Sequence, residues 1–178
     1  MTYDILTILC GKQVLASSPI ILQGFTSGDN ICMTGTLLRI SQAYSICKGT
    51  VVSVSKDYDG LYVVTIQYSA DKWIRYCHLD VVAVGNNQKV KPRDLIGHAH
   101  HNELRFEYCT LEQSDHIVRI SNQTCYKHDP IGILYGVDTL PTIPDTIYVP
   151  SEEMKVVSEK PLSIYKNNLS DIMNNPGR

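Results

Sequence analysis

The sequence predicts a mainly β protein whose core is an antiparallel sheet of short strands. Two stretches rich in β-branched residues, 49–55 and 61–68, alternate in polarity and flank a turn rich in Asp and Gly, which is typical of a β-hairpin. Residues 103–109 alternate as regularly, with apolar side chains on one face and charged side chains on the other. Because no long stretch has the periodicity of an amphipathic helix, the expected class is mainly β.

The other expected elements are short. Further strands are expected over residues 72–78, 89–92, 94–97 and 117–120. Single helical turns are expected at residues 81–84 and 169–173.

The chain divides into three parts by composition. Residues 1–17 are expected to form an N-terminal strand or extension, and residues 18–136 a single domain. Residues 137–178 contain five prolines, each of which removes a backbone donor and interrupts regular structure. This last segment is therefore expected to be an extended arm. Its apolar residues favour an arm that orders against a neighbouring subunit over a free tail.

Composition and charge narrow the functional classes. The chain has 178 residues, of which 43% are apolar and 19% charged, and a formal net charge of -2. A sizeable core is therefore possible, and there is no electrostatic reason to expect nucleic acid or an anionic membrane as a partner. No run approaches the roughly 18 apolar residues that cross a bilayer. The start of the chain lacks the basic region of an export signal, so we expect none.

The six cysteines are widely spaced, and none forms a CxxC pair. In a chain without an export signal, such cysteines are expected to be reduced strand residues and not disulfides or zinc ligands. The sequence therefore predicts a protein that folds in a cytoplasm.

A dense group of histidines precedes the strand expected at 103–109. These histidines are His98, His100 and His101. Histidines beside carboxylates are typical of a metal site, and His78 or Glu103 could complete one. The alternatives are polar loop histidines exposed to solvent, or a contact that responds to pH.

Three segments, taken in order, resemble a known family. They are YCHLD (76–80), VGNNQKVKPRDLIG (84–97) and NELRFEY (102–108). Their order resembles the lysostaphin-like zinc endopeptidases, which cut peptidoglycan cross-bridges and show Tyr-x-His-Leu, a Gly- and Val-containing turn unit, and then His-Leu-His-Phe-Glu. Residues 21–38 are similar to the stretch of that family that ends in His-x-Gly-x-Asp. The resemblance covers residues 18–136 and implies a lysostaphin-like peptidase fold.

The functional residues of that family carry over one at a time. The resemblance places its zinc ligands on Met33, Leu37 and Arg105, and one catalytic histidine on Glu103, while the other is retained as His78. Methionine and leucine are poor ligands for zinc, and a guanidinium has no lone pair to give. The resemblance therefore implies a pseudoenzyme without metal or other cofactor, in which these positions are vestigial. Arg105 could fill the electropositive place of the metal and pair with Glu103.

The resemblance also implies a groove in which the peptidases of that family hold their substrate, and this groove could still bind glycan or peptide. The candidate groove residues are Trp73, Tyr76, His98, His100 and His101. For Trp73 and the other aromatic residues, ordinary packing in the sheet is the competing interpretation. Arg75 and Lys72 are expected on a solvated strand face.

By analogy with inactive relatives of this fold, the expected function is structural. The sequence favours a bacteriophage tail or baseplate subunit, located in the virion, assembled in the host cytoplasm and oligomeric. Its expected partners are other tail proteins, which would bind through the arm at 137–178. Peptidoglycan is a second candidate partner. The alternatives are a peptidoglycan-binding module, a zinc endopeptidase with relocated ligands, and an activator of amidases.

Overall fold

The computed structural model describes residues 4–15, 20–25 and 35–136. Met33, the turn expected at 169–173 and the arm at 137–178 lie outside these ranges. The described elements, in chain order, are α1 (Asp4–Cys10), β1 (Ile21–Gln23), β2 (Thr36–Arg39), β3 (Gln42–Tyr44), β4 (Gly49–Lys56), β5 (Tyr62–Ser69), β6 (Lys72–Val82), β7 (Lys89–Val90), β8 (Leu95–Ala99), η2 (His100–Asn102), β9 (Glu103–Thr110), β10 (Ile117–Ile120), β11 (Gln123–His128) and α2 (Ile131–Leu134). The predicted class, mainly β with an antiparallel sheet, is confirmed.

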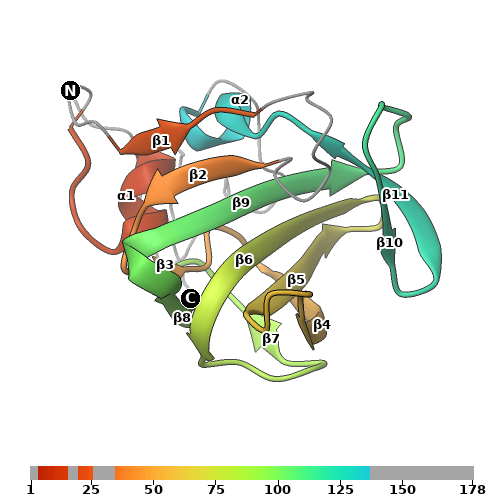
Figure 1. Ribbon diagram of the computed structural model, residues 1–178, viewed down its shortest axis with the longest axis horizontal. Helices are drawn as coiled ribbons and strands as arrows, with labels where there is room; N and C mark the ends of the chain where they lie inside the picture. The colour runs from red at the N-terminus through yellow and green to blue at the C-terminus, as the bar shows by residue number, and fades with distance from the viewer. Residues whose placement is uncertain (1–3, 16–19, 26–34, 137–178) are drawn as a thin grey trace.

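One antiparallel sheet organises the described chain (Figure 1). Its main path runs β1-β2-β9-β6-β5-β4-β7, so β9 and β6 lie at the centre. The hairpin β10–β11 joins β9 through β11, and β3 joins β6 through β8. The central strands β6 and β9 are also those that carry most of the family resemblance, so the sheet holds the candidate site in its middle.

The strands expected from alternation are confirmed, but β6 is longer than expected, and the sheet also contains β1, β2 and β3, for which no strand was expected. The hairpin β4–β5, β9 and β10 lie where they are expected. Strand β6 continues to Val82, and Val81 and Val82 pair with β8, so the helical turn expected at 81–84 is wrong. Strand β11 was not expected. Its alternation of apolar and polar residues is weak because a charged residue, Lys127, occupies a buried position on the same face as Cys125.

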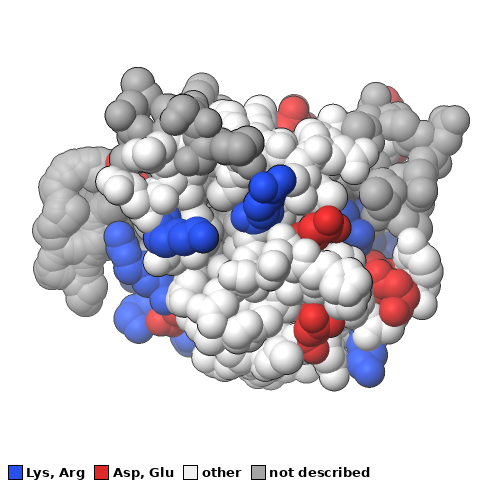
Figure 2. Space-filling view, turned by 60° about the vertical axis from the view of Figure 1, so that its left-hand side comes forward, with Lys and Arg blue, Asp and Glu red and all other residues white. Residues whose placement is uncertain are grey.

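Charged side chains are dispersed over the surface. On the face shown in Figure 2, Lys and Arg, and Asp and Glu, form separate small patches divided by uncharged surface. Among the described residues, no helix is both long enough and apolar enough to cross a membrane.

The N-terminal segment, expected to be a strand or extension, forms the helix α1, and this expectation is wrong. Apolar residues stand at positions 5, 6, 8 and 9, a spacing that lines one face of a helix. Leu6 and Leu9 are fully buried there. Gly11 ends the helix with a φ of 73°, and its N–H donates to the carbonyl of Thr7 at 3.0 Å. The helix is only seven residues long, so packing and not intrinsic propensity stabilises it.

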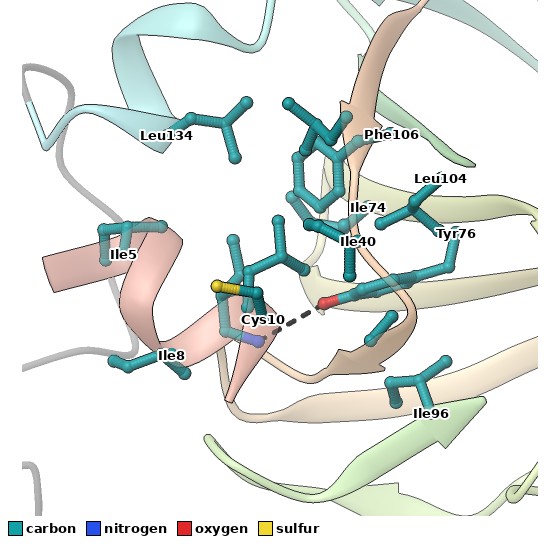
Figure 3. Close-up of a cluster of buried hydrophobic side chains, with 14 of the residues drawn as sticks. Ile5, Ile8, Cys10, Ile40, Ile74, Tyr76, Ile96, Leu104, Phe106 and Leu134 are labelled. Carbon is teal, nitrogen blue, oxygen red and sulfur yellow. Dashed lines mark hydrogen bonds between the residues drawn. The ribbon is translucent and has the colours of Figure 1, made fainter. Parts of the chain in front are cut away.

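The main core lies between the two helices and one face of the sheet (Figure 3). Ile74 and Tyr76 of β6 and Leu104 and Phe106 of β9 are each fully buried on this face. The Tyr76 hydroxyl donates to the carbonyl of Tyr44 at 3.1 Å and accepts from the N–H of Ile46 at 3.3 Å. Burying a phenol is favourable only when its hydroxyl is paired, and both hydrogen bonds meet that requirement.

The opposite face of the sheet carries a second, smaller apolar cluster. It contains Trp73, Cys109, Ile120 and Cys125. Successive residues of a strand point to opposite faces, so Trp73 and Ile74 belong to different clusters. The central strands are thus covered on both sides.

Candidate functional site

Two of the positions that resemble zinc ligands meet in the fold. Leu37 in β2 is the direct cross-strand partner of Arg105 in β9. Arg105 in turn lies opposite Cys77 in β6, the residue before His78. Directly opposed residues of an antiparallel pair project from the same face. The fold therefore brings the expected positions together, although the residues there are not those of a zinc site.

Arg105 is held by two carboxylates. Its Nε donates to Oε2 of Glu107 at 3.2 Å, and its Nη2 donates to Oδ2 of Asp57 at 3.1 Å. Asp57 lies in the turn between β4 and β5, so this contact joins the hairpin tip to the centre of the sheet. The carboxylate expected to pair with Arg105 was that of Glu103. The structure shows the pair with Glu107 instead, two residues further along the same face of β9.

Glu107 is the centre of a buried ionic network. Its carboxylate is only 1% exposed and accepts from Nη1 of Arg75 at 2.7 Å, Nε of Arg105 at 3.2 Å and Nζ of Lys127 at 3.1 Å. Arg75 also donates through Nε to the hydroxyl of Thr65 at 3.3 Å. The sequence predicts Arg75 on a solvated strand face. That prediction is wrong, because its side chain is only 16% exposed and is bound to Glu107. A buried carboxylate is stable only when its lone pairs are satisfied, and these cations satisfy them.

We call this set of residues the ionic cluster. Its members are Asp57, Arg75, Arg105, Glu107 and Lys127. It draws on β6, β9, β11 and the turn between β4 and β5. The alternation of β9 indicated that Arg105 and Glu107 share a face. Nothing in the sequence indicated Lys127, because its strand was not expected.

Gly35 makes room for the ionic cluster. By the resemblance it holds the glycine position of His-x-Gly-x-Asp. A Cβ at Gly35 would lie 2.9 Å from Cγ of Arg105, 3.0 Å from Cγ of Glu107 and 3.1 Å from the carbonyl oxygen of Phe106. The two long side chains thus pack directly on the bare backbone of Gly35.

The residues at the zinc position do not fit a zinc ion. Leu37 has no donor atom, and Arg105 carries a permanent positive charge. Burial tends to lower the pKa of Arg105, but its interactions with Cys77 and Glu107 outweigh this effect and raise it. Burial raises the pKa of the Cys77 thiol to about 12, so the neighbouring sulfur is a neutral thiol and not the thiolate that binds metals. Within the described ranges, no three His, Cys, Asp or Glu side chains are arranged to hold a metal ion.

His78, the retained catalytic histidine, sits in a break of the β5–β6 ladder. Tyr62 pairs with Leu79 and Val63 with Cys77, so His78 is the extra residue of a bulge. Its φ of 74° is left-handed, which is unusual for any residue other than glycine. Nδ1 of His78 lies 2.7 Å from the carbonyl oxygen of Glu103. By the resemblance, Glu103 stands where the family has its other catalytic histidine. Here the contact with His78 is made by the backbone carbonyl of Glu103.

At the bulge His78 contacts His100, which in turn contacts His101. The ring of His78 lies edge-on to His100, with 5.1 Å between centroids, and the rings of His100 and His101 stack at 3.7 Å. Nδ1 of His100 lies 2.7 Å from Oδ1 of Asp80. We call His78, His100 and His101 the histidine cluster. His98 belongs to β8, where it is half-buried and lies opposite Val81 in the ladder.

Two of the candidate groove residues are core residues. Trp73 is 2% exposed and Tyr76 is fully buried. Neither side chain offers surface to glycan or peptide, because both faces of β6 are covered by apolar clusters. Of the candidate groove residues, His98, His100 and His101 remain at least partly exposed.

Comparison with known proteins supports the fold of this chain but assigns it no function. The sequence matches no protein-family model and no curated protein. Among solved structures, the antimicrobial peptidase lysostaphin from Staphylococcus simulans is similar with a TM-score of 0.51 and 18% identity, over 71% of this chain and 56% of that chain. The structure of LytU is similar with a TM-score of 0.49 and 17% identity, over 64% of this chain and 82% of that chain.

A structure of the SpoIIIAH and SpoIIQ complex contains a chain that is similar with a TM-score of 0.47 and 19% identity, over 66% of this chain and 94% of that chain. The chain thus spans little more than half of the lysostaphin structure, and identities below one fifth describe architecture alone. The fold of this chain is the lysostaphin-like peptidase fold.

Proposed function

We propose that this chain is a non-catalytic assembly or interaction domain on a degenerate lysostaphin-like peptidase fold. One observation carries the proposal. Arg105 lies opposite Leu37 at the position of two zinc ligands, and it is held there by Glu107 and Asp57. A zinc peptidase needs an ion that activates water and polarises the scissile carbonyl. A paired guanidinium beside an aliphatic side chain supplies neither function.

The burial of the ionic cluster also supports the proposal. The side chain of Arg105 is 13% exposed and that of Glu107 only 1%. Removing one partner from a buried ion pair is costly, so the cluster resists rearrangement into a metal site. In its place the sheet gains a fixed set of cross-strand contacts, which suits a structural role.

A bacteriophage tail or baseplate is the particular assembly that we propose. Its support is confined to the sequence: the dispersed cysteines and the proline-rich segment at 137–178. That segment would contact neighbouring subunits. The same proposal places the chain in the virion and makes it oligomeric.

The test of the non-catalytic role is a hydrolysis assay with added zinc. The full chain is incubated with purified peptidoglycan and with a pentaglycine peptide, with lysostaphin as the positive control. We expect no cleavage at any zinc concentration. Zinc-dependent cleavage that a chelator abolishes would overturn the proposal. The triple variant Met33→His, Leu37→Asp, Arg105→His shows in parallel whether the scaffold can still accept the ligand set.

The test of the assembly role is the mass of the full chain in solution. Light scattering coupled to size exclusion is expected to show an oligomer that persists on dilution. A chain that is monomeric at every concentration, and that is absent from purified virions of its source, would contradict the assembly role. The hydrolysis result would be unaffected.

A further inference from the structure

The histidine cluster lies outside the ionic cluster and has no role in the proposed function. His78 comes from the bulge in β6, and His100 and His101 come from η2, which precedes β9. The ring of His100 contacts both of the others, with 5.1 Å between its centroid and that of His78 and 3.7 Å between its centroid and that of His101. His101 is exposed, whereas His78 and His100 are half-buried.

Hydrogen bonding fixes the tautomer of two of these rings. The carbonyl oxygen of Glu103 can only accept, so Nδ1 of His78 must be the donor across their 2.7 Å contact. The ionised carboxylate of Asp80 likewise only accepts, so Nδ1 of His100 is also a donor, at 2.7 Å. In each neutral ring the lone pair therefore lies on Nε2. Metal-binding histidines show this same arrangement, with one nitrogen donating to a carboxylate or backbone carbonyl and the other facing the ion.

The backbone is left-handed at two members of the histidine cluster and at the residue that follows His101. His78 has a φ of 74°, His101 of 53° and Asn102 of 59°. Left-handed conformations of residues other than glycine persist where the surrounding structure enforces them, and they gather at functional sites. Here the left-handed residues include His78 and His101, the two histidines whose rings contact His100.

The spacing of His78 and His100 suits a shared ion. With metal–nitrogen bonds of about 2 Å and tetrahedral angles, two imidazole centroids lie roughly 5 Å apart. The observed separation is 5.1 Å, with the ring planes 80° apart. No three groups of the described chain are already arranged around an ion. A third ligand would therefore come from His101, whose exposed ring can rotate.

We propose that His78, His100 and His101 form a binding site for a divalent transition metal ion. Imidazole nitrogens without thiolates select ions such as Zn²⁺, Ni²⁺ or Cu²⁺ over Mg²⁺ and Ca²⁺, which prefer oxygen. The ion would join the end of β6 to η2, and solvent would complete its coordination. The site uses neither Leu37 nor Arg105. It is therefore independent of the zinc position of the peptidase fold and of the proposed function.

The test is titration of the full chain, stripped of metal with a chelator, with ZnCl₂ by calorimetry and with CoCl₂ by visible absorption. One equivalent of Zn²⁺ is expected to bind saturably. His100→Ala and His78→Asn are each expected to weaken binding at least tenfold, as roughly tenfold effects are typical even of residues that only orient a ligand. Asparagine tolerates a left-handed backbone, so His78→Asn removes the ligand while keeping the bulge.

Two further variants make the result decisive. Asp80→Asn weakens the orientation of His100 and is expected to lower affinity about tenfold without removing a ligand. His98→Ala removes a neighbouring histidine outside the cluster and is expected to leave binding unchanged. Absence of saturable binding would overturn the proposal. So would binding that survives His100→Ala and Asp80→Asn, or that is lost equally in His98→Ala. Circular dichroism of each variant separates lost binding from lost folding.

Discussion

Arg105 in β9 lies directly opposite Leu37 in β2, and its guanidinium is bonded to Glu107 and Asp57. By the resemblance, these two residues stand where the peptidase family has zinc ligands, and the structure shows a paired guanidinium there. The charge at this point of the sheet remains positive, but it is now fixed to a strand.

Glu107→Gln is expected to destabilise the protein strongly. The carboxylate is 1% exposed and accepts from Arg75, Arg105 and Lys127, so its neutralisation leaves buried cations poorly compensated. Loss of one partner from a buried ion pair costs about 3–5 kcal/mol of unfolding free energy. Urea unfolding of the variant and of the wild-type protein measures this loss of unfolding free energy. Glu112→Gln, at an exposed position, is the matched control and should change stability by less than about 0.5 kcal/mol. Equal effects would show that the ionic cluster is not structural.

Gly35→Ala is expected to disturb the same cluster through packing. The new methyl would meet Cγ of Arg105 at 2.9 Å and the carbonyl oxygen of Phe106 at 3.1 Å, and the backbone atom cannot move aside easily. Overpacking of this kind costs about 1–3 kcal/mol. Gly85→Ala is the control, because a Cβ there meets no atom within 4 Å. A Gly35→Ala protein as stable as the Gly85→Ala protein would contradict this account of the glycine.

Much of the sheet could be predicted from the sequence, because period-two alternation is a local signal. It located the β4–β5 hairpin and β9 correctly. The resemblance also implied that positions 37 and 105 belong to one site, and they are paired in the ladder. Helix α1 was missed because its seven residues have little helical tendency of their own and are stabilised by packing against distant strands.

The composition of the site was less predictable than its location. Partners of a buried charge depend on register and on which strand comes alongside, and Lys127 and Asp57 are distant in sequence from Arg105. Trp73 and Tyr76 were candidates for a groove because aromatic side chains can line sugar- or protein-binding surfaces, with packing in the sheet as the alternative. Here both faces of β6 are covered, so both residues are core.

Stability is expected to fall at alkaline pH through the buried thiols. Burial raises the pKa of Cys77 and of Cys47 to about 12, whereas an exposed thiol ionises near pH 8.5. Below about pH 8.5 the two thiols are protonated in both the folded and the unfolded chain, and their contribution to stability is fully present. Above it, the unfolded chain releases protons that the folded chain retains, so stability declines by up to about 1.4 kcal/mol per pH unit for each thiol until about pH 12.

The double variant Cys47→Ala, Cys77→Ala tests this dependence. Unfolding free energies measured in reductant at several values between about pH 8.5 and pH 10.5 should decline less steeply with pH in this variant. Val51→Ala, a truncation at another fully buried position, is the control. It should lower stability by a similar amount at every pH and leave the slope unchanged. An unaltered slope in the double variant would contradict the assignment to these thiols.

Comparing Gly11→Ala with Gly60→Ala separates the backbone cost of replacing a left-handed glycine from the steric cost of an added methyl group at the end of α1. Both glycines have a left-handed φ, 73° and 81°, so each substitution carries the same backbone penalty of about 1–2 kcal/mol. At Gly60 no atom lies within 4 Å of an added Cβ, whereas at Gly11 that atom would overlap the ring of Tyr44 at 2.3 Å. Gly11→Ala is therefore expected to lose a further ~1–3 kcal/mol, because Tyr44 or α1 must shift. Urea unfolding of the two variants measures the difference. Equal losses would mean that the contact between α1 and β3 contributes little to the stability of the fold.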